Sequence, residues 1–345
     1  MTDLPHDPRS FHVESELAAD ATSEAAASEM APPRRRRRWP WIVSALLLLV
    51  ALVVGAFGAA AWSTWSDVEK IDLDSVLAGS EGGTNYLIVG TDSRDGVSAD
   101  TANAGVIFGD GVAGERTDTI AVLRVSSDST RLLAIPRDLY VPLEGGSHNR
   151  INAAFAFGGP EALISTIQRE LGIGIDHYLE IDLAGFLGLV DALGGVTIHF
   201  PHPAYDIKSG LQIDTAGAVH LEGSEALAYV RSRNHVEIVD GVDIRDLTSD
   251  LGRVQRQQRF LAAVFAELGS TRNPFTLLGA LDGVSGNVSV DSGLSLRGAA
   301  SLGLAVRGAD PLTATVPTSR YITDGGADVL LMTPEAEAVF AEFRG

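Results

Sequence analysis

The most extended pattern in the chain is an uncharged run of 28 residues, 39–66, whose apolar centre extends from Ile42 to Ala61. A helix over residues 41–62 would be ~33 Å long at about 1.5 Å per residue, which matches a hydrocarbon layer of ~30 Å. Tryptophans stand near both ends of the run, as is typical of side chains at a membrane interface. The pattern therefore predicts one transmembrane helix over residues 39–66.

Five consecutive arginines, 34–38, come directly before this run. Because such clusters stay in the cytoplasm, we expect a single-pass protein of the cell membrane with residues 67–345 on the extracytoplasmic side. A cleaved signal peptide is an alternative, since residues 59–61 are all alanine, but the apolar run exceeds the roughly 7–15 residues of a signal peptide. A buried core helix is a second alternative, although core helices of this length rarely lack charge.

Beyond the anchor, short apolar runs alternate with runs that have helical spacing. Residues 85–90, 119–125 and 131–135 have the composition of strands. Residues 160–171 carry apolar positions at helical spacing, and Asp182 is placed to cap another helix. This alternation predicts an α/β fold with a mixed central sheet and helices on both faces, preceded by the transmembrane helix.

The pattern divides the chain into four parts. Residues 1–38 form a cytoplasmic tail that ends in the basic cluster, and its acidic, Ala- and Ser-rich composition predicts disorder. Residues 39–66 are the anchor, 67–83 a linker, and 84–345 one extracytoplasmic domain.

Composition narrows the chemistry of that domain. The chain has no cysteine, so disulfides, thiol catalysis and cysteine zinc sites are excluded. Its net charge is −19, so we expect no nucleic-acid partner bound through a general basic surface. Lys70 and Lys208 are the only lysines, and nearly every cation is therefore a planar guanidinium suited to bidentate phosphate binding.

Polar and charged side chains cluster at the predicted ends of strands and helices, where α/β folds bind ligands. These positions are Asp92 and Arg94 after the first strand, Arg116 and Asp118 before the second, Arg137 and Asp138 after the third, Arg150 and Asn152 before a helix, Arg231 and Arg233 at a helix end, and Asp250, Arg253 and Gln257 on a later helix. Carboxylates suit Mg²⁺, which keeps few protein ligands besides substrate phosphates, and arginines suit pyrophosphate oxygens. Structural ion pairs are the alternative interpretation.

Seven stretches, in this order and spacing, resemble the LytR–CpsA–Psr family of membrane-anchored cell-envelope phosphotransferases. They are NYLIVGTDSR (85–94), ERTDTIAVLRV (115–125), LLAIPRDLYV (132–141), RINAAFAFGGP (150–160), IDHYLEIDLAGFLGLVDALGGVTI (175–198), LEGSEALAYVRSR (221–233) and DLGRVQRQQRFL (250–261). The resemblance covers about residues 84–268.

The resemblance implies transfer of a glycopolymer from an undecaprenyl-pyrophosphate carrier onto peptidoglycan through a phosphodiester. It assigns Mg²⁺ (or Mn²⁺) to Asp92 and Asp118, and the pyrophosphate to Arg94, Arg116, Arg137, Arg231, Arg233 and Arg253. Gln257 would assist. Asp92, Asp138 and Asp250 remain open as general base. The identity of the polymer, such as teichoic acid, capsule or another wall glycan, also remains open.

The implied lipid carrier needs an apolar channel, and its candidate lining is residues 153–157, Leu163, Ile167, Phe186, Leu187 and Val190, with core packing as the alternative. Two insertions, 96–114 and 234–249, interrupt the family pattern, and we expect the second to be a surface loop rather than a lid. Two other functions use the same residues: a polyprenyl-pyrophosphate hydrolase, and a non-catalytic glycan-lipid binding or regulatory protein.

Overall fold

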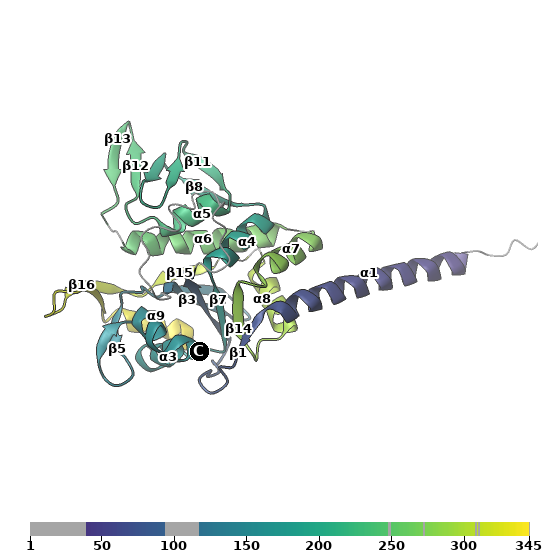
Figure 1. The fold of residues 1–345 in the computed structure, drawn as a ribbon, viewed down its shortest axis with the longest axis horizontal. Helices are drawn as coiled ribbons and strands as arrows, with labels where there is room; N and C mark the ends of the chain where they lie inside the picture. The colour runs from purple at the N-terminus through teal and green to yellow at the C-terminus, as the bar shows by residue number, and fades with distance from the viewer. Residues whose placement is uncertain are drawn as a thin grey trace, which may run out of the picture. The chain divides into compact units, whose positions relative to one another are not determined.

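A computed structural model describes residues 39–93, 117–247, 250–271, 273–307, 309 and 311–344 (Figure 1). Helix α1 extends over Trp39–Asp67, where the sequence predicts the transmembrane helix. Most side chains of residues 39–54 lie outside the described part, as does the whole predicted cytoplasmic tail. No helix among the described residues has the length and apolar character needed to cross a membrane.

The described strands form a seven-stranded mixed sheet in the order β1-β14-β7-β2-β3-β4-β15. The pairs β1/β14, β7/β2 and β4/β15 are parallel, and the other neighbours are antiparallel. The strand bounds are Glu69–Ile71 (β1), Val288–Asp291 (β14), His177–Ile181 (β7), Thr84–Thr91 (β2), Thr117–Val125 (β3), Thr130–Ala134 (β4) and Leu312–Thr315 (β15). The segment 67–83, interpreted from sequence as a linker, thus supplies the edge strand β1 and buries Leu73 completely.

Helices cover both faces of this sheet, which confirms the predicted mixed α/β architecture (Figure 1). On one face, Leu87 and Val89 of β2 pack with α3 (Asn152–Leu171) and α9 (Ala336–Arg344). On the other face, Tyr86 packs in a core with side chains of α6 (Asp250–Ser270) and α8 (Leu296–Val306). The alternation along β2 therefore separates two cores, as the period-two geometry of a strand requires.

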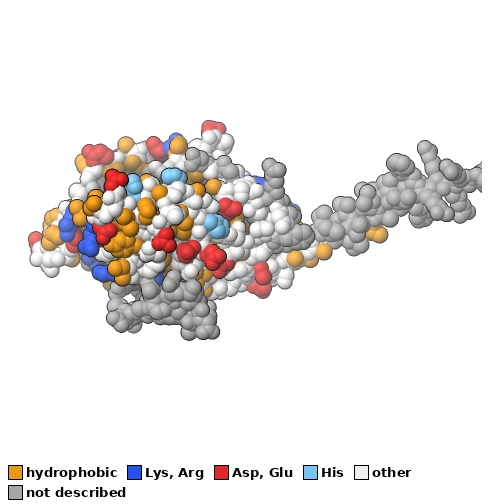
Figure 2. Space-filling view, turned by 90° about the horizontal axis from the view of Figure 1, so that it is seen from above, with side chains coloured by type: hydrophobic (Ala, Val, Ile, Leu, Met, Phe, Trp, Pro, Cys, Tyr) orange, Lys and Arg blue, Asp and Glu red, His pale blue; other side chains and the backbone are white. Residues whose placement is uncertain are grey.

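A second layer of the described structure lies over one end of the sheet. Its bounds are Leu183–Leu193 (α4), Gly223–Arg231 (α5), Pro274–Val284 (α7), Val196–Phe200 (β8), Ala204–Asp206 (β9), Leu211–Ile213 (β10), Gly217–Leu221 (β11), Val236–Val239 (β12) and Val242–Arg245 (β13). Two further hairpins pair Tyr140–Pro142 (β5) with His148–Arg150 (β6), and Thr318–Ile322 (β16) with Asp328–Met332 (β17). Figure 2 looks down on the β8–β13 side, where hydrophobic side chains gather beside Lys and Arg.

The insertion 234–249, expected to be a surface loop, is exposed along β13 but forms a hairpin for most of its length. β12 pairs with β13 and also with β9, which joins the hairpin to a small antiparallel sheet. Asp240 and Gly241 form its tip with φ of 51° and 79°. An Asp-Gly pair between two runs of alternating apolar and polar residues is a strong hairpin pattern, because both tip residues need positive φ.

A buried carboxylate fastens β14 to β7. Asp291 accepts a hydrogen bond from the backbone N–H of Tyr178 at 3.0 Å, and its Oδ2 lies 3.1 Å from His177 Nδ1. Burial alone would raise the pKa of Asp291, but the hydrogen bonds from His177, Tyr178 and Leu294 outweigh it and hold the pKa below its ordinary value. The carboxylate therefore stabilises the fold in its charged form.

We expect Asp291→Asn to lower the free energy of unfolding at neutral pH by about 1–3 kcal/mol, because buried donors lose a charged acceptor. A depressed pKa stabilises the folded state above the unfolded pKa of about 3.9, and this contribution is lost as pH falls through the folded value. In denaturant unfolding, the difference in the free energy of unfolding between wild type and variant should therefore be smaller below pH ~4 than at neutral pH. Asp324→Asn, at an exposed aspartate, is the control. If Asp291→Asn lowers the free energy of unfolding equally at both pH values, the stabilising role of the charged Asp291 carboxylate is contradicted.

Candidate active site

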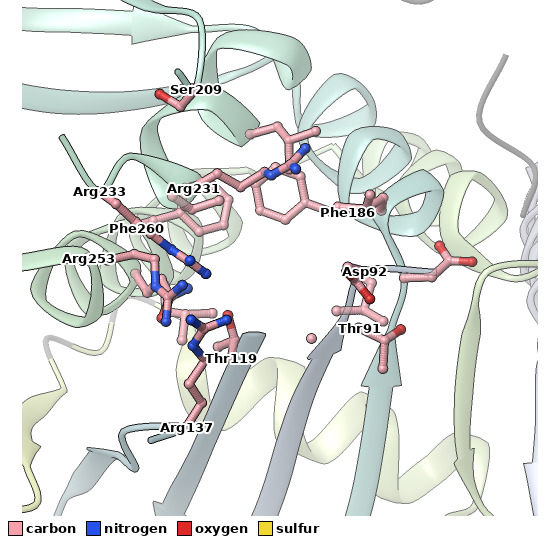
Figure 3. A pocket seen from close by; sticks show the side chains of 18 of the residues that line it. Thr91, Asp92, Thr119, Arg137, Phe186, Ser209, Arg231, Arg233, Arg253 and Phe260 are labelled. Atoms are coloured by element: carbon pink, nitrogen blue, oxygen red, sulfur yellow. The ribbon is translucent and has the colours of Figure 1, made fainter. Parts of the chain in front are cut away.

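A cavity of about 530 Å³ lies where the ends of β2 and β7 meet helices α4, α5 and α6 (Figure 3). β2 and the residue after it supply Gly90, Thr91 and Asp92, and the start of α4 supplies Asp182 and Phe186. The remaining described lining is Ile88, Thr119, Arg137, Ile181, Leu183, Asp206, Lys208, Ser209, Leu227, Val230, Arg231, Arg233, Asn234, Arg253, Gln257, Phe260 and Leu261. The site thus lies at strand ends, where the sequence placed it.

One side of the cavity is strongly cationic. Arg137 follows β4, Arg231 ends α5, Arg233 follows it by two residues, and Arg253 lies on α6. Figure 3 shows Arg137, Arg233 and Arg253 together, with Thr91 and Asp92 across the cavity from them. Arg253 is 1% exposed, which is rare for an arginine. Four guanidinium groups on one cavity attract an anion with several oxygens, such as a pyrophosphate.

The carboxylates among the described lining residues differ in what they do. Asp182 caps α4 by accepting a hydrogen bond from the backbone N–H of Gly185 at 2.7 Å. Asp206 accepts hydrogen bonds from several backbone groups nearby. Asp92 follows β2 directly and faces the arginines (Figure 3). Two of these carboxylates are therefore engaged in local structure, and the lining leaves a cationic excess for a ligand.

Another part of the cavity lining is apolar. Phe186 of α4 and Phe260 of α6 lie with their ring centroids 4.8 Å apart. Ile88, Leu227 and Leu261 add aliphatic surface to the same cavity. A ligand that joins a phosphate group to a hydrocarbon chain matches this amphipathic lining.

Most of the predicted lipid-channel residues lie elsewhere. Phe186 lines the cavity, but Leu163 and Ile167 are fully buried between α3 and the sheet. Val190 is fully buried in the core beneath α4, and Leu187 packs against that core. The prediction failed for α3 because this helix covers the face of the sheet opposite the cavity side, which helical spacing alone does not indicate.

The fold brings together many of the predicted polar site residues. Asp92, Arg137, Arg231, Arg233, Arg253 and Gln257 all line the cavity. Arg94 and Arg116 lie outside the described residues, as do the side chains of Asp118 and Asp250. Asp138 is not in the cavity lining; its Oδ1 lies 3.1 Å from Arg150 Nε, and its Oδ2 lies 3.5 Å from Arg137 Nε. Asp138 thus links a lining arginine to a second arginine behind it.

The backbone places the two predicted metal ligands at adjoining ends of neighbouring strands, Asp92 just after β2 and Asp118 near the start of β3. Gly90 pairs with Thr119 and Thr91 with Thr117, so Asp118 is the extra residue of a β-bulge beside the end of β2. Within the described part of the chain, the buried Oγ1 atoms of Thr91 and Thr117 have no hydrogen-bond partner. Oxygen donors beside Asp92 fit a hard cation such as Mg²⁺, which needs only one or two protein carboxylates. Among the described residues, there is no group of three or more His, Asp or Glu side chains that could hold a metal ion by themselves.

Asp206 is a lining residue that the sequence pattern did not indicate. Burial alone would raise the pKa of its carboxyl, but hydrogen bonds from Ser232 and from backbone N–H groups of Asn234, Lys208 and Ser209 hold the pKa below its ordinary value. The sequence Asp206-Ile-Lys-Ser-Gly is typical of a turn that an aspartate stabilises. That pattern indicates the turn, but not the contact with Ser232, which lies 26 residues further along the chain.

Comparison with known proteins agrees with the family resemblance. The LytR_cpsA_psr family model matches residues 59–340. The probable cell wall biosynthesis protein LcpB of Corynebacterium glutamicum is 36% identical over 301 residues, which cover 85% of this chain and 69% of that protein. The polyisoprenyl-teichoic acid–peptidoglycan teichoic acid transferase TagU of Halalkalibacterium halodurans is 37% identical over 230 residues, which cover 65% of this chain and 66% of that protein.

Solved structures share the fold described above. A LytR-Csp2A-Psr enzyme from Actinomyces oris superposes with a TM-score of 0.64 at 26% identity, covering 80% of this chain and 96% of that one. TagV of Bacillus subtilis gives a TM-score of 0.58 at 25% identity, covering 76% of this chain and 95% of that one. The match of the family model to residues 59–340 includes the central sheet and every described lining residue of the cavity. On the strength of this match, the chain belongs to the LytR–CpsA–Psr family.

Proposed function

We propose that this chain is a phosphotransferase that moves a glycopolymer from an undecaprenyl-pyrophosphate carrier onto peptidoglycan. The observation that carries the proposal is the cavity itself, which combines four arginines, a facing aspartate and an apolar lining. A pyrophosphate bound by the arginines would place its polyprenyl chain against Phe186 and Phe260. The TagU relative is named as a polyisoprenyl-teichoic acid–peptidoglycan teichoic acid transferase, which supports the same reaction class.

In the proposed reaction, a hydroxyl oxygen of peptidoglycan attacks the phosphorus that carries the glycan. A new oxygen–phosphorus bond forms, the bond to the lipid phosphate breaks, and undecaprenyl phosphate leaves with the pyrophosphate's bridging oxygen. Arg137, Arg231, Arg233 and Arg253 stabilise the charge that develops on the phosphate oxygens. Mg²⁺ (or Mn²⁺), held by Asp92 and Asp118, would neutralise part of that charge.

The attacking hydroxyl gives up a proton, and Asp92, Asp138 and Asp250 are the candidate bases. Asp92 lines the cavity, whereas Asp138 contacts Arg137 and Arg150 from outside the lining. This placement favours Asp92 over Asp138 for direct contact with an acceptor. Asp138 is better placed to orient Arg137.

The proposal includes anchoring of the chain by residues 39–66, with the N-terminus in the cytoplasm and the catalytic domain outside. It rests on the uncharged run and on the arginine cluster that precedes it. A membrane position suits an enzyme whose donor is itself a lipid.

The test uses the full-length chain in detergent with Mg²⁺, a short-chain polyprenyl-pyrophosphate glycan and a peptidoglycan oligomer. Mass spectrometry should detect the glycan joined to the acceptor through a phosphate, and chelation of Mg²⁺ should prevent this product. Release of a phosphorylated glycan without joining would instead indicate a hydrolase. Binding of the lipid without any turnover would indicate a non-catalytic binding protein.

A further inference from the structure

The turn 231–234 carries two of the four cavity arginines. Helix α5 ends at Arg231, Ser232 is its C-terminal cap, and Arg233 follows. Arg231 and Arg233 both line the cavity, while Ser232 between them is completely buried. The direction in which these two guanidinium groups point therefore depends on what holds the backbone around Ser232.

Asp206 of β9 holds this turn from one side. Its Oδ2 accepts a hydrogen bond from Ser232 Oγ at 2.8 Å. The same oxygen accepts from the backbone N–H groups of Arg233 at 2.9 Å and Asn234 at 2.7 Å. Asp206 is 1% exposed and ionised, so these are charge-assisted hydrogen bonds within the protein interior.

Arg256 of α6 holds the same turn from the other side. Its Nη2 donates to the backbone carbonyl of Ser232 at 2.8 Å, and its Nη1 donates to Asp246 Oδ2 at 2.9 Å. Arg256 is 5% exposed, and the backbone N–H of Asp246 donates to the carbonyl of His235 at 2.8 Å. The hydroxyl and carbonyl of Ser232 are thus both bonded to buried charged groups on other elements.

We propose that Asp206 and Arg256 are positioning residues that orient Arg231 and Arg233 towards the donor pyrophosphate. This inference rests on the proposed function. Guanidinium forks bind phosphate oxygens well only in a defined direction, so a backbone fixed at Ser232 aligns both forks before the ligand arrives. Neither residue needs to contact the ligand for this effect. The negative charge of Asp206 also offsets repulsion between the neighbouring cations.

The test measures binding of inorganic pyrophosphate to the full-length chain by calorimetry in a double-mutant cycle. Asp206→Asn should weaken binding on the order of tenfold, because an amide keeps the shape but places an N–H₂ group against backbone donors. Arg233→Ala should weaken binding directly. In the double variant the Asp206→Asn effect should be smaller than in the wild-type background, because one of its two arginine targets is absent.

Matched controls separate positioning from folding. Asp243→Asn removes a carboxylate that accepts from Tyr205 on the same small sheet, and it should bind pyrophosphate like wild type. Ser232→Ala removes one of the hydrogen bonds to Asp206 and should weaken binding about two- to threefold, which keeps the test available if Asp206→Asn does not fold. Circular dichroism and melting temperature report the fold of each variant.

The outcomes distinguish this inference from the proposed function. If Arg233→Ala weakens binding but folded Asp206→Asn and Ser232→Ala do not, the positioning role is wrong and the pyrophosphate site stands. If the effects of Asp206→Asn and Arg233→Ala simply add, Asp206 does not act through Arg233. If Arg233→Ala leaves binding unchanged, the proposed site fails and the positioning role fails with it.

Discussion

Replacing Arg137 with alanine is expected to lower the rate of glycan transfer by about 10²–10³-fold, the cost of removing one preorganised donor from a developing oxyanion. Arg137 reaches the cavity from the end of β4, and Figure 3 shows it beside Arg253 and opposite Asp92. Its side chain lines the existing cavity rather than a hydrophobic core cluster, so we expect the fold to persist without it. Initial rates of product formation, with melting temperatures alongside, measure the effect.

Two further variants test whether the effect depends on the position of Arg137 and on the planar shape of its guanidinium group. Arg131 lies on the same strand β4 but pairs with Glu342 away from the cavity, so Arg131→Ala should transfer at the wild-type rate. Arg137→Lys keeps the charge and loses the planar fork, and it should recover only part of the activity. Full activity of Arg137→Ala, or an equal loss in Arg131→Ala, would contradict a role for Arg137 in the transition state.

The sequence predicts the parts of this fold that local pattern determines. The apolar run of β2 and the helical spacing of residues 160–171 are short-range features, and the structure has a strand and a helix there. Strand β1 is three residues long and β14 reads Val-Ser-Val-Asp, so neither has a strong pattern of its own. They become strands because they pair with each other and β14 also pairs with β7, a long-range pairing that no local window contains.

The same distinction applies to the site. Placing charged residues at strand ends was sufficient to predict that Asp92 and Arg137 lie close together, because strand ends in α/β sheets meet at one edge, and both residues line the cavity. Asp206 could not be found in this way, since its proposed positioning role rests on long-range contacts with Ser232 and Asn234. The hairpin β12–β13 could have been predicted from its Asp240-Gly241 pair, but the contact between Asp246 and Arg256 could not.

Replacing Asp92 with asparagine is expected to lower the transfer rate on the order of 100-fold and to raise the Mg²⁺ concentration needed for half-maximal activity. Asp92 faces the arginines and stands beside buried Thr91 and the bulge at Asp118, the position proposed for Mg²⁺. An amide retains one oxygen ligand but loses the negative charge that attracts the cation. Rates measured over a range of Mg²⁺ concentrations test this expectation.

The control and the pH dependence separate two roles for Asp92. Asp128 is an exposed carboxylate in the turn between β3 and β4, at the end of β3 away from Asp118. Asp128→Asn should therefore retain the wild-type Mg²⁺ dependence. If Asp92 acts only as a metal ligand, saturating Mg²⁺ should restore much of the activity of Asp92→Asn, and the acidic limb of the pH–rate profile should persist. If Asp92 is instead the general base, no concentration of Mg²⁺ restores the rate and that limb disappears, because the group that must be deprotonated is absent.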